Sequence, residues 1–517
     1  MLLHELVTEV AVAHPDRPAL IVDDQVTTFA ELDDRVASLA RAVAAVAARG
    51  DRVAFVAANG PEWVEAYYAV PRAGCLLGFV NHRLGPQAKR DAVARYEPAV
   101  LVGDVDQLAE LAATGPLADL APVVVAIGDG AVDGALPYER FVAGGRAAGP
   151  GSRALPADLD PHDTAWLIAT SGTSGTPKVV ELSHANLLAA VDTTRAARPM
   201  HDDDVYLFPF PLCHVAGYNV VLFHRIGRPV VIARQFTAAG LVEQVRRHRV
   251  TNVSLAPTMV DAIVDHVDAT GDSLAPLRTV SYGSSPISPS LLTRAIERVG
   301  AGFQQGYGMT ELSGNAVFLG ADDHERGLAG EPALLRAAGR PGPGVEVRLL
   351  DDDGSEVPAG ATGEIAVRAP QVTEGYWRAP EANAAAFVDG WFRTGDVGRL
   401  DATGLLTIVD RKKDIIISGG ENVSSREVED KLAAHPDVAA VAVVGAPDPR
   451  WGELVCAFVV PRSGADLGPE DVLAYGRAAI GGFQQPRRVE VVDDLPRNGS
   501  GKVLKHELRA RLAGAPA

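Results

Sequence analysis

The apolar residues near the start of the chain follow first a helical and then a strand-like spacing. Thr28 and Glu31 have the spacing of a capping box, in which each side chain satisfies a backbone N–H at a helix start. The apolar residues that follow recur every three or four positions and predict one buried helical face, formed by Leu32, Val36, Leu39, Val43 and Val46. We expect Gly50 to end this helix as its C′ residue, and the apolar run 53–57 to be a buried strand.

The same alternation continues over residues 160–310. Short apolar runs predict strands at residues 166–170, 253–256, 279–282 and 302–304, with helices between them. Strands that alternate with helices are typical of parallel sheets whose faces are covered by the helices. The pattern therefore predicts an α/β fold.

The pattern changes after Gly344. Residues 345–350 and 363–368, separated by an acidic turn, predict a small antiparallel β unit, which we expect to be barrel-like. A smaller α+β unit begins after Asp410, with predicted strands at 414–418, 438–444 and 455–460, a capping box at 424–427 and a closing helix at 503–512. The Ala-, Pro- and Gly-rich stretch 328–343 is expected to be a surface loop.

Length and charge narrow the class of protein. A chain of 517 residues exceeds what one core usually supports, so we expect at least two domains. The net charge of −18 argues against nucleic acid as a general partner, because phosphate backbones require clustered Lys and Arg. No apolar run reaches the length of a spanning helix and no signal peptide is visible, so we expect a cytoplasmic enzyme without a membrane partner. The isolated Cys75, Cys213 and Cys456 fit neither a disulfide framework nor a metal site.

The most informative segment is the loop that follows the apolar run 166–169. It is dense in glycines and hydroxyls and ends in a lysine: Thr170, Ser171, Gly172, Thr173, Ser174, Gly175, Thr176, Pro177 and Lys178. Glycines let backbone N–H groups converge on an anion and hydroxyls add donors, so the loop is a candidate phosphate cradle. It is not a Walker A loop, because Pro177 precedes the lysine and Val179 follows it. A short Gly/Ser run alone is also typical of a surface loop.

Four further segments follow in order: residues 305–311, 390–396, 410–422 and 496–505. Each has an ordinary structural explanation when taken singly. Tyr307 could be a core tyrosine, Glu311 a surface glutamate, and Lys502 an exposed loop lysine.

Taken together, the five segments resemble the signatures of the adenylate-forming superfamily. This superfamily contains acyl-CoA synthetases, peptide-synthetase adenylation domains and beetle luciferases. The resemblance extends to residues 59–63 and 73–75, so it covers essentially the whole chain. Five signatures in the family's order are not explained by chance, and the separate structural explanations fail jointly.

The resemblance implies a nucleotide site. Residues 170–175 and Lys178 would hold the β- and γ-phosphates of ATP, and Gly283 and Ser284 would border both the adenine and the acyl group. The remaining implied contacts are Tyr307 stacked on the adenine, Thr310 at the α-phosphate, Glu311 on Mg²⁺, Asp396 at the ribose hydroxyls, and Arg411 at the ribose or phosphate. A flat π-surface suits a purine, and a hard oxygen ligand suits magnesium.

The resemblance also implies an N-terminal domain over residues 1–410 and a mobile C-terminal domain over residues 411–517. Lys413 would be the hinge, and domain alternation about it would serve two half-reactions. Lys502 would neutralise charge while a carboxylate attacks the α-phosphorus of MgATP. Gly419, Gly420 and Glu421 would then face a thiol that attacks the acyl-adenylate.

The acyl group and its acceptor are less closely defined. His214, in the segment that resembles the acyl-pocket lining, stands where domains that activate α-amino acids carry an aspartate, so such a substrate is disfavoured. A histidine is usual there in acyl- and aryl-CoA synthetases, where it gates the pocket, and we favour a small or medium acid, aryl acids included. CoA is the favoured thiol. Departures from the family pattern at 424–425 and 483–486 leave a carrier-bound phosphopantetheine or a nitrogen nucleophile as alternatives.

Two further alternatives are an inactive relative and an oxygenase of the luciferase type. An inactive relative is expected to have lost Lys502 or Glu311, and the chain has both. The oxygenases share these motifs, and nothing in the sequence favours them.

Overall fold

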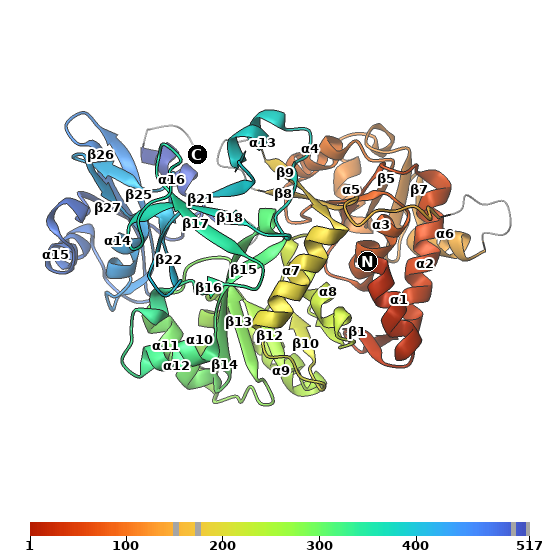
Figure 1. Cartoon of the computed structure of the whole chain (residues 1–517), viewed down its shortest axis with the longest axis horizontal. Coiled ribbons are helices and arrows are strands. Elements are labelled where there is room, and N and C mark those ends of the chain that lie inside the picture. The colour runs from red at the N-terminus through yellow and green to blue at the C-terminus, as the bar shows by residue number, and fades with distance from the viewer. Residues whose placement is uncertain (148–154, 171–176, 498–502, 513–517) are drawn as a thin grey trace.

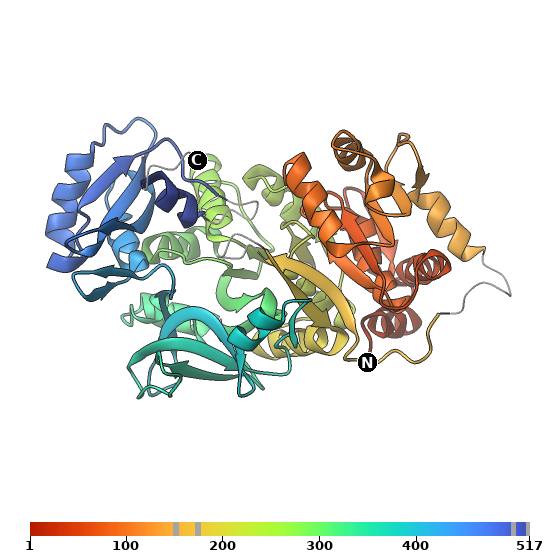
Figure 2. The ribbon, with the colours of Figure 1, turned by 90° about the horizontal axis from the view of Figure 1, so that it is seen from above.

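The computed structural model describes residues 1–147, 155–170, 177–497 and 503–512. Figure 1 shows the C-terminal elements, in blue, at one end of the molecule and the N-terminal helices, in red, at the other. In the view from above, the antiparallel unit of residues 346–411, drawn mostly in teal, forms a separate layer beside the two large sheets (Figure 2). The described helices include none that is long and apolar enough to cross a bilayer.

The first large sheet has eight strands in the order β19-β9-β8-β4-β3-β5-β6-β7. Its strands are β3 (Arg52–Val56), β4 (Leu76–Phe79), β5 (Val100–Asp104), β6 (Val123–Ile127), β7 (Ala135–Pro137), β8 (Thr164–Thr170), β9 (Lys178–Ser183) and β19 (Gly375–Tyr376). The strands from β8 to β7 run parallel, and β9 and β19 add an antiparallel edge. The associated helices are α1 (Leu3–Ala13), α2 (Phe29–Val46), α3 (Pro61–Arg72), α4 (Pro86–Tyr96), α5 (Val105–Ala112) and α6 (Tyr138–Arg146).

The second large sheet has nine strands in the order β16-β15-β14-β13-β12-β10-β11-β1-β2. Its strands are β1 (Pro18–Val22), β2 (Gln25–Thr28), β10 (Tyr206–Phe208), β11 (Val230–Ile232), β12 (Asn252–Leu255), β13 (Thr279–Gly283), β14 (Gly302–Met309), β15 (Gly314–Leu319) and β16 (Arg340–Pro341). The strands from β1 to β14 are parallel. The helices of this part are α7 (His184–Ala197), α8 (Tyr218–Arg225), α9 (Ala238–His248), α10 (Pro257–Thr270), α11 (Pro289–Val299) and α12 (Ala321–Leu328).

The rest of the chain forms two smaller β units. The expected barrel-like unit is an antiparallel five-stranded sheet of β17 (Glu346–Leu350), β18 (Thr362–Arg368), β20 (Phe387–Val388), β21 (Trp391–Leu400) and β22 (Leu406–Arg411), joined by α13 (Pro380–Ala386). The C-terminal unit contains β23 (Ile416–Ser418), β24 (Glu421–Val423), β25 (Val438–Asp448), β26 (Gly452–Pro461) and β27 (Arg488–Val491), with α14 (Ser425–Leu432), α15 (Pro469–Ala479) and α16 (Lys505–Leu512). The predicted fold class, a large N-terminal α/β part followed by a smaller α+β part, is confirmed.

The start of α2 is as predicted, and its end is not. Glu31 N donates to the Thr28 hydroxyl, and Thr28 N donates to the Glu31 carboxylate, which completes the capping box. The helix ends at Val46, because Ala47 already has extended dihedral angles. The Val46 side chain is 43% exposed. Gly50 is therefore not the C′ residue. It takes a φ of +84° in the turn before β3, where its N–H donates to the Gly74 carbonyl.

The stretch 328–343 is only in part the surface loop that the composition predicted: residues 328–333 are exposed, and most of residues 334–342 are buried or half-buried. Leu334 and Leu335 are buried, and β16 pairs with β15. The two leucines pack beneath α12, where a Cβ on Gly327 would overlap the Leu335 side chain. Burial of these two leucines therefore decides where the segment lies, although the Pro- and Gly-rich composition around them is typical of a loop.

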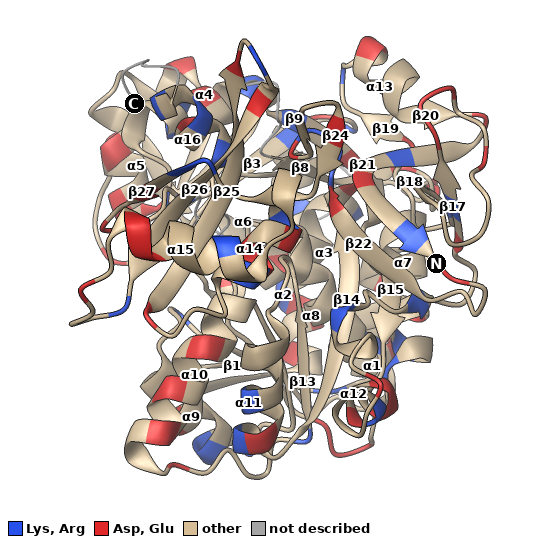
Figure 3. Ribbon diagram, turned by 90° about the vertical axis from the view of Figure 1, so that its left-hand side faces the viewer, with Lys and Arg blue, Asp and Glu red and all other residues tan. Residues whose placement is uncertain are grey.

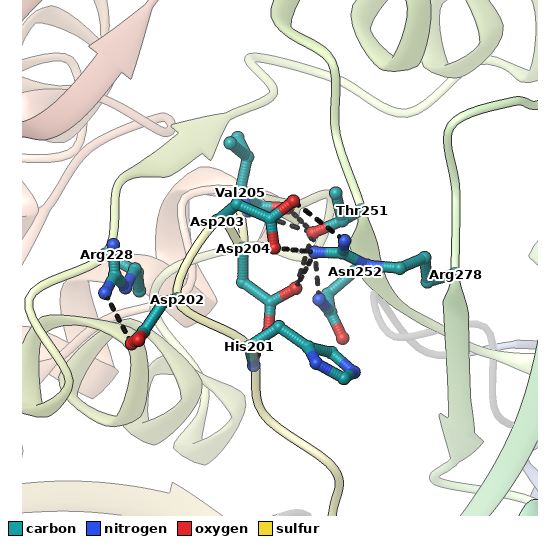
Figure 4. A network of polar contacts seen from close by, with 9 residues as sticks. All are labelled: His201, Asp202, Asp203, Asp204, Val205, Arg228, Thr251, Asn252 and Arg278. Carbon is teal, nitrogen blue, oxygen red and sulfur yellow. Dashed lines mark hydrogen bonds and ion pairs between the residues drawn. The ribbon is translucent and has the colours of Figure 1, made fainter.

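A buried polar network holds the amino ends of three parallel strands together (Figure 4). The Asp204 carboxylate precedes β10 and accepts hydrogen bonds from Arg278 Nη2 at 2.6 Å and from Thr251 Oγ1 at 2.9 Å. Thr251 precedes β12, and Arg278 precedes β13 and also binds Asp203 with two nitrogens. The network lies at the amino edge of the sheet, opposite the carboxyl edge at which α/β folds usually bind ligands.

On the side of the molecule that faces the viewer in Figure 3, the acidic residues are not gathered in one patch. Figure 3 shows acidic and basic residues interspersed over α9, α10 and α11. Arg294 of α11, for example, binds both Asp265 and Asp268 of α10. Such mixed surfaces favour solubility over binding of a polyanion.

Candidate active site

Two groups of predicted residues meet beyond the carboxyl end of β14. The strand ends at Met309, and the short helix Thr310–Leu312 turns the chain so that Tyr307 and Glu311 lie on either side of this corner. Close packing against β15 explains the glycines of this segment, since a Cβ on Gly308 would overlap the Gly314 carbonyl. Thr310 begins the turn and is partly exposed.

The first group contains Tyr307, Asp396 and Arg411. Asp396 and Arg411 are directly opposite each other in the β21–β22 ladder, and Arg411 Nε lies 3.3 Å from Asp396 Oδ1. The Tyr307 hydroxyl donates to Asp396 Oδ2 at 2.8 Å. Burial, together with the Asp396 charge, raises the pKa of Tyr307 well above its ordinary value, so the hydroxyl stays protonated. With the hydroxyl so bound, the ring faces are what Tyr307 offers to a purine.

The second group joins Glu311 to Lys178 through Tyr376. The Tyr376 hydroxyl donates to Glu311 Oε1 at 3.0 Å, and Lys178 Nζ lies 4.6 Å from the centre of the Tyr376 ring. Burial raises the pKa of Glu311. Thr170 and Lys178 are paired across the β8–β9 hairpin, so they stand at the two ends of the predicted phosphate loop.

Part of the predicted site lies outside the described residues. Ser171, Gly172, Thr173, Ser174 and Gly175 fall between the described ranges, and so does Lys502. Their predicted roles therefore stay predictions.

The residues at hand fit a magnesium ion bound with a nucleotide. No group of three His, Cys, Asp or Glu side chains that could hold a metal on its own occurs among the described residues. Mg²⁺ is usually held by one or two carboxylates together with substrate phosphates and water. Glu311, whose Oε1 accepts one hydrogen bond from Tyr376, matches that donor set.

Gly283 and Ser284 lie at the end of β13, the strand next to β14. Gly283 pairs with Gly306, and a Cβ on Gly283 would come within 2.5 Å of the Gly306 carbonyl oxygen. Ser284 has a φ of +70°, an uncommon value for a residue other than glycine. The chain therefore turns sharply beside the Tyr307 segment.

His214 lies in the loop between β10 and α8. Burial, with smaller contributions from the positive Arg83 and from His82, lowers its pKa to about 4, so the imidazole is neutral near pH 7. Its Nε2 is buried and has no hydrogen-bond partner among the residues that the structure describes, and the same holds for His82 Nδ1. Two unsatisfied imidazole nitrogens at one place favour a polar ligand group there.

The loop that carries His214 is anchored by helix α3 and by the loop between β3 and α3. Asn59 Nδ2 donates to the carbonyls of Phe210 and Ala233 at 2.7 and 2.8 Å, and Asn59 Oδ1 accepts from Leu212 N at 2.8 Å. The Tyr67 hydroxyl also donates to the Leu212 carbonyl. The acyl-side loop is thus held by side chains far away in the sequence.

The predicted hinge and thiol-side residues belong to a different group. Lys413 lies between β22 and β23, where Arg509 of α16 donates to its carbonyl, and burial lowers its pKa. Gly419 and Gly420, with φ of +64° and +83°, form the turn into β24, and Glu421 is exposed. Within the described part of the chain, no hydrogen bond joins this turn to Glu311 or Lys178.

Tyr376 and His82 were not singled out from the sequence. Tyr376 lies 65 positions from Glu311, and His82 follows a strand from another part of the chain. Neither residue belongs to a local motif with a defined chemical spacing. The Gly-Tyr-Trp run at 375–377 is a faint signal, because a glycine within a strand often marks a bulge or a close approach of a ligand or another backbone.

Family models match most of the chain. A model described as AMP-binding enzyme covers residues 7–377, and one described as AMP-binding enzyme C-terminal domain covers residues 427–502. A feruloyl-CoA synthase of Amycolatopsis sp. is 37% identical over 456 residues, which are 88% of this chain and 87% of the relative. The fatty acid–acyl-carrier-protein ligase ScoC of Streptomyces coeruleorubidus is 37% identical over 367 residues, 70% of each chain.

Solved structures have the same fold over nearly the full length. The amide bond synthetase McbA from Marinactinospora thermotolerans has a TM-score of 0.86 at 35% identity and covers 98% of this chain and 99% of its own. The o-succinylbenzoate CoA synthetase MenE from Bacillus subtilis, in complex with ATP and a magnesium ion, has a TM-score of 0.83 at 28% identity, covering 97% and 98%. The first family model spans more than half of the sequence, and the chain therefore belongs to the AMP-binding enzyme family of the adenylate-forming superfamily.

Proposed function

We propose that this enzyme activates a carboxylic acid with MgATP and transfers the acyl group to the thiol of CoA. The observation that carries the proposal is the meeting of Lys178, Glu311 and Tyr376 beside Tyr307, Asp396 and Arg411. These side chains come from six separate strands or turns, and they match the charges of a nucleoside triphosphate: cations for phosphate, a carboxylate for magnesium, and a carboxylate for ribose hydroxyls.

In the first half-reaction, an oxygen of the substrate carboxylate attacks the α-phosphorus. The bond between the α-phosphorus and the bridging oxygen breaks, and pyrophosphate leaves. Lys178 and the loop at 170–175 hold the β- and γ-phosphates, Thr310 contacts the α-phosphate, and Lys502 neutralises the charge that develops there. A magnesium ion on Glu311 supplies further charge neutralisation when bound.

In the second half-reaction, the thiol sulfur attacks the acyl carbonyl and AMP leaves. We propose that residues 411–517 turn about Lys413 between the two steps, which withdraws Lys502 and brings Gly419, Gly420 and Glu421 to the acyl-adenylate. Gly283 and Ser284 border the acyl group, and His214 contacts it. The substrate class is a small or medium carboxylic acid, aryl acids included, and the feruloyl-CoA synthase relative supports this choice.

A different acceptor is the second candidate. The similarity to the amide bond synthetase McbA favours a nitrogen nucleophile, and the similarity to ScoC favours a carrier protein. The segment 483–486 contains no lysine and its Phe483 is 47% exposed, so the surface that would receive the acceptor differs from the common family pattern.

Pyrophosphate exchange over a panel of carboxylic acids tests the first half-reaction. Lys502→Ala is expected to slow exchange by about 100-fold or more, because it removes a cation from the transferring centre. The same variant should form thioester from supplied acyl-adenylate and CoA at close to the wild-type rate. A panel of amines and a phosphopantetheinyl carrier, offered in place of CoA, identifies the acceptor. Equal loss in both half-reactions contradicts the role of Lys502. If none of the acids in the panel supports pyrophosphate exchange, the proposed function is contradicted.

A further inference from the structure

A short strap, residues 370–376, links the turn that carries Glu311 to strand β9. Thr373 N donates to the Glu311 carbonyl oxygen at 2.8 Å, and the Thr373 hydroxyl donates to the Glu181 carbonyl of β9. The strap therefore fixes the position of the predicted metal ligand relative to the hairpin that carries the phosphate lysine.

Tyr376 ends this strap and is held firmly. Its N–H donates to Asn383 Oδ1 at 2.6 Å, and its carbonyl accepts from Asn383 Nδ2 at 3.0 Å. The residue is 6% exposed, and its ring meets the edge of Phe387. A side chain anchored on backbone and ring in this way has one orientation in which to act on its neighbours.

Tyr376 contacts both Glu311, the predicted metal ligand, and Lys178, the predicted phosphate ligand. Its hydroxyl donates to Glu311 Oε1, while its ring lies beneath the Lys178 ammonium. Glu311 and Lys178 have opposite charges, but the described residues include no ion pair between them. A direct ion pair would have to break before either residue could bind a ligand, because each charge would neutralise the other.

We propose that Tyr376 is a positioning residue that keeps Glu311 and Lys178 apart and available for a metal–triphosphate. Its hydroxyl orients the Glu311 carboxylate toward the metal, and its ring supports Lys178 beside the phosphate loop. This inference rests on the proposed function, and it assigns separate tasks to the hydroxyl and to the ring.

Two substitutions separate these tasks. Tyr376→Phe removes the hydroxyl and keeps the ring, whereas Tyr376→Leu removes both. Binding of a non-hydrolysable α,β-methylene analogue of ATP is measured by titration calorimetry, once with Mg²⁺ and once with EDTA. Tyr138→Phe is the matched control, because the Tyr138 hydroxyl donates at 2.8 Å to the buried Glu65, a residue outside the site.

Tyr376→Phe should bind the analogue about tenfold more weakly with Mg²⁺ and as well as wild type with EDTA, since a hydrogen bond to a charged group is lost. Tyr376→Leu should also lose about tenfold with EDTA, because Lys178 loses its support. The control should bind like wild type in both media.

Unchanged binding of Tyr376→Phe with Mg²⁺ overturns the inference, as does an equal loss by both variants in both media. If the leucine variant does not fold, the phenylalanine variant decides alone. If the wild-type protein binds no nucleotide, the proposed function itself is contradicted. If the wild type binds nucleotide and Tyr376→Phe binds it equally well, only the role of Tyr376 is contradicted.

Discussion

Two histidines near opposite ends of α8, the buried His224 and the half-buried His214, differ in how their nitrogens are satisfied. His224, in the last turn, has both nitrogens bonded: Nε2 lies 3.0 Å from the Ala19 carbonyl, and Nδ1 lies 2.8 Å from the Tyr68 hydroxyl. Because a carbonyl only accepts, the proton is on Nε2, and Nδ1 accepts from Tyr68. His214, before the first turn, has a buried Nε2 without a partner among the described residues.

The pKa values of the two histidines do not reveal this difference. Burial lowers the pKa of each to about 4, so both imidazoles are neutral near pH 7. A buried polar atom whose bonds are filled by the protein stabilises the fold, and one left open is a cost that a ligand can offset. We therefore interpret His224 as part of the core and His214 as part of the proposed acyl site.

The largest effect is expected from His224→Leu. This change leaves the Tyr68 hydroxyl and the Ala19 carbonyl buried without partners, which should lower the free energy of unfolding by about 4 kcal/mol. Urea denaturation measures the loss. Tyr68→Phe in the same background should restore part of it, because it removes one of the two unsatisfied groups. A His224→Leu protein as stable as wild type contradicts the assignment of His224 to the core.

The pH dependence of stability should be similar for both histidines. In the folded chain the pKa of each is about 4, below the value of about 6.5 in the unfolded chain, so the unfolded state binds more protons between these pH values. The stability that each neutral histidine contributes is present above pH 6.5 and lost as the pH falls toward 4, to the extent of about 3 kcal/mol.

Unfolding curves of His224→Leu and His214→Phe between pH 4 and pH 8 measure this effect. Each variant should have a shallower slope than wild type, while at pH 8 the His224 variant alone should be clearly destabilised. Unequal slopes would mean that the two sites differ in more than their hydrogen bonds. His4 and His184, whose pKa values burial also lowers to about 4, remain in both variants and maintain a common background.

The smallest effect is expected from His214→Phe in a binding assay. The KM for the carboxylic acid in pyrophosphate exchange should rise by about tenfold, equivalent to about 1.4 kcal/mol, while the KM for MgATP stays at the wild-type value. His214→Gln, which keeps a donor, should recover part of the affinity. An unchanged KM for every acid places His214 outside the acyl site.

Local patterns predicted many of the elements and several contacts of the site. The capping box at Thr28 and Glu31 formed as expected, because both partners lie within one turn. Residues 345–350 and 363–368 paired as an antiparallel unit, with Glu346 opposite Arg368 and Leu350 opposite Glu364. Tyr307, Asp396 and Arg411 were identified from motifs, and the structure brings these three together.

Other features depend on neighbours that the local sequence does not contain. Leu334 and Leu335 are buried within a loop-like composition because α12 covers them. Val46 is exposed although its spacing continues the apolar face, because the helix ends before another element covers it. In both cases burial is decided by packing across the fold, which outweighs local propensity.

By itself, the sequence determined the alternation of strands and helices, the two-part organisation and the family, because these follow from short-range periodicity and ordered motifs. Tertiary structure alone decided that Tyr376 meets Glu311 and Lys178, and that Asn59 holds the loop of His214. The physical reason is that a hydrogen bond or ring contact depends on a separation of a few ångströms. Only the folding of distant strands onto common edges brings residues from different parts of the chain that close.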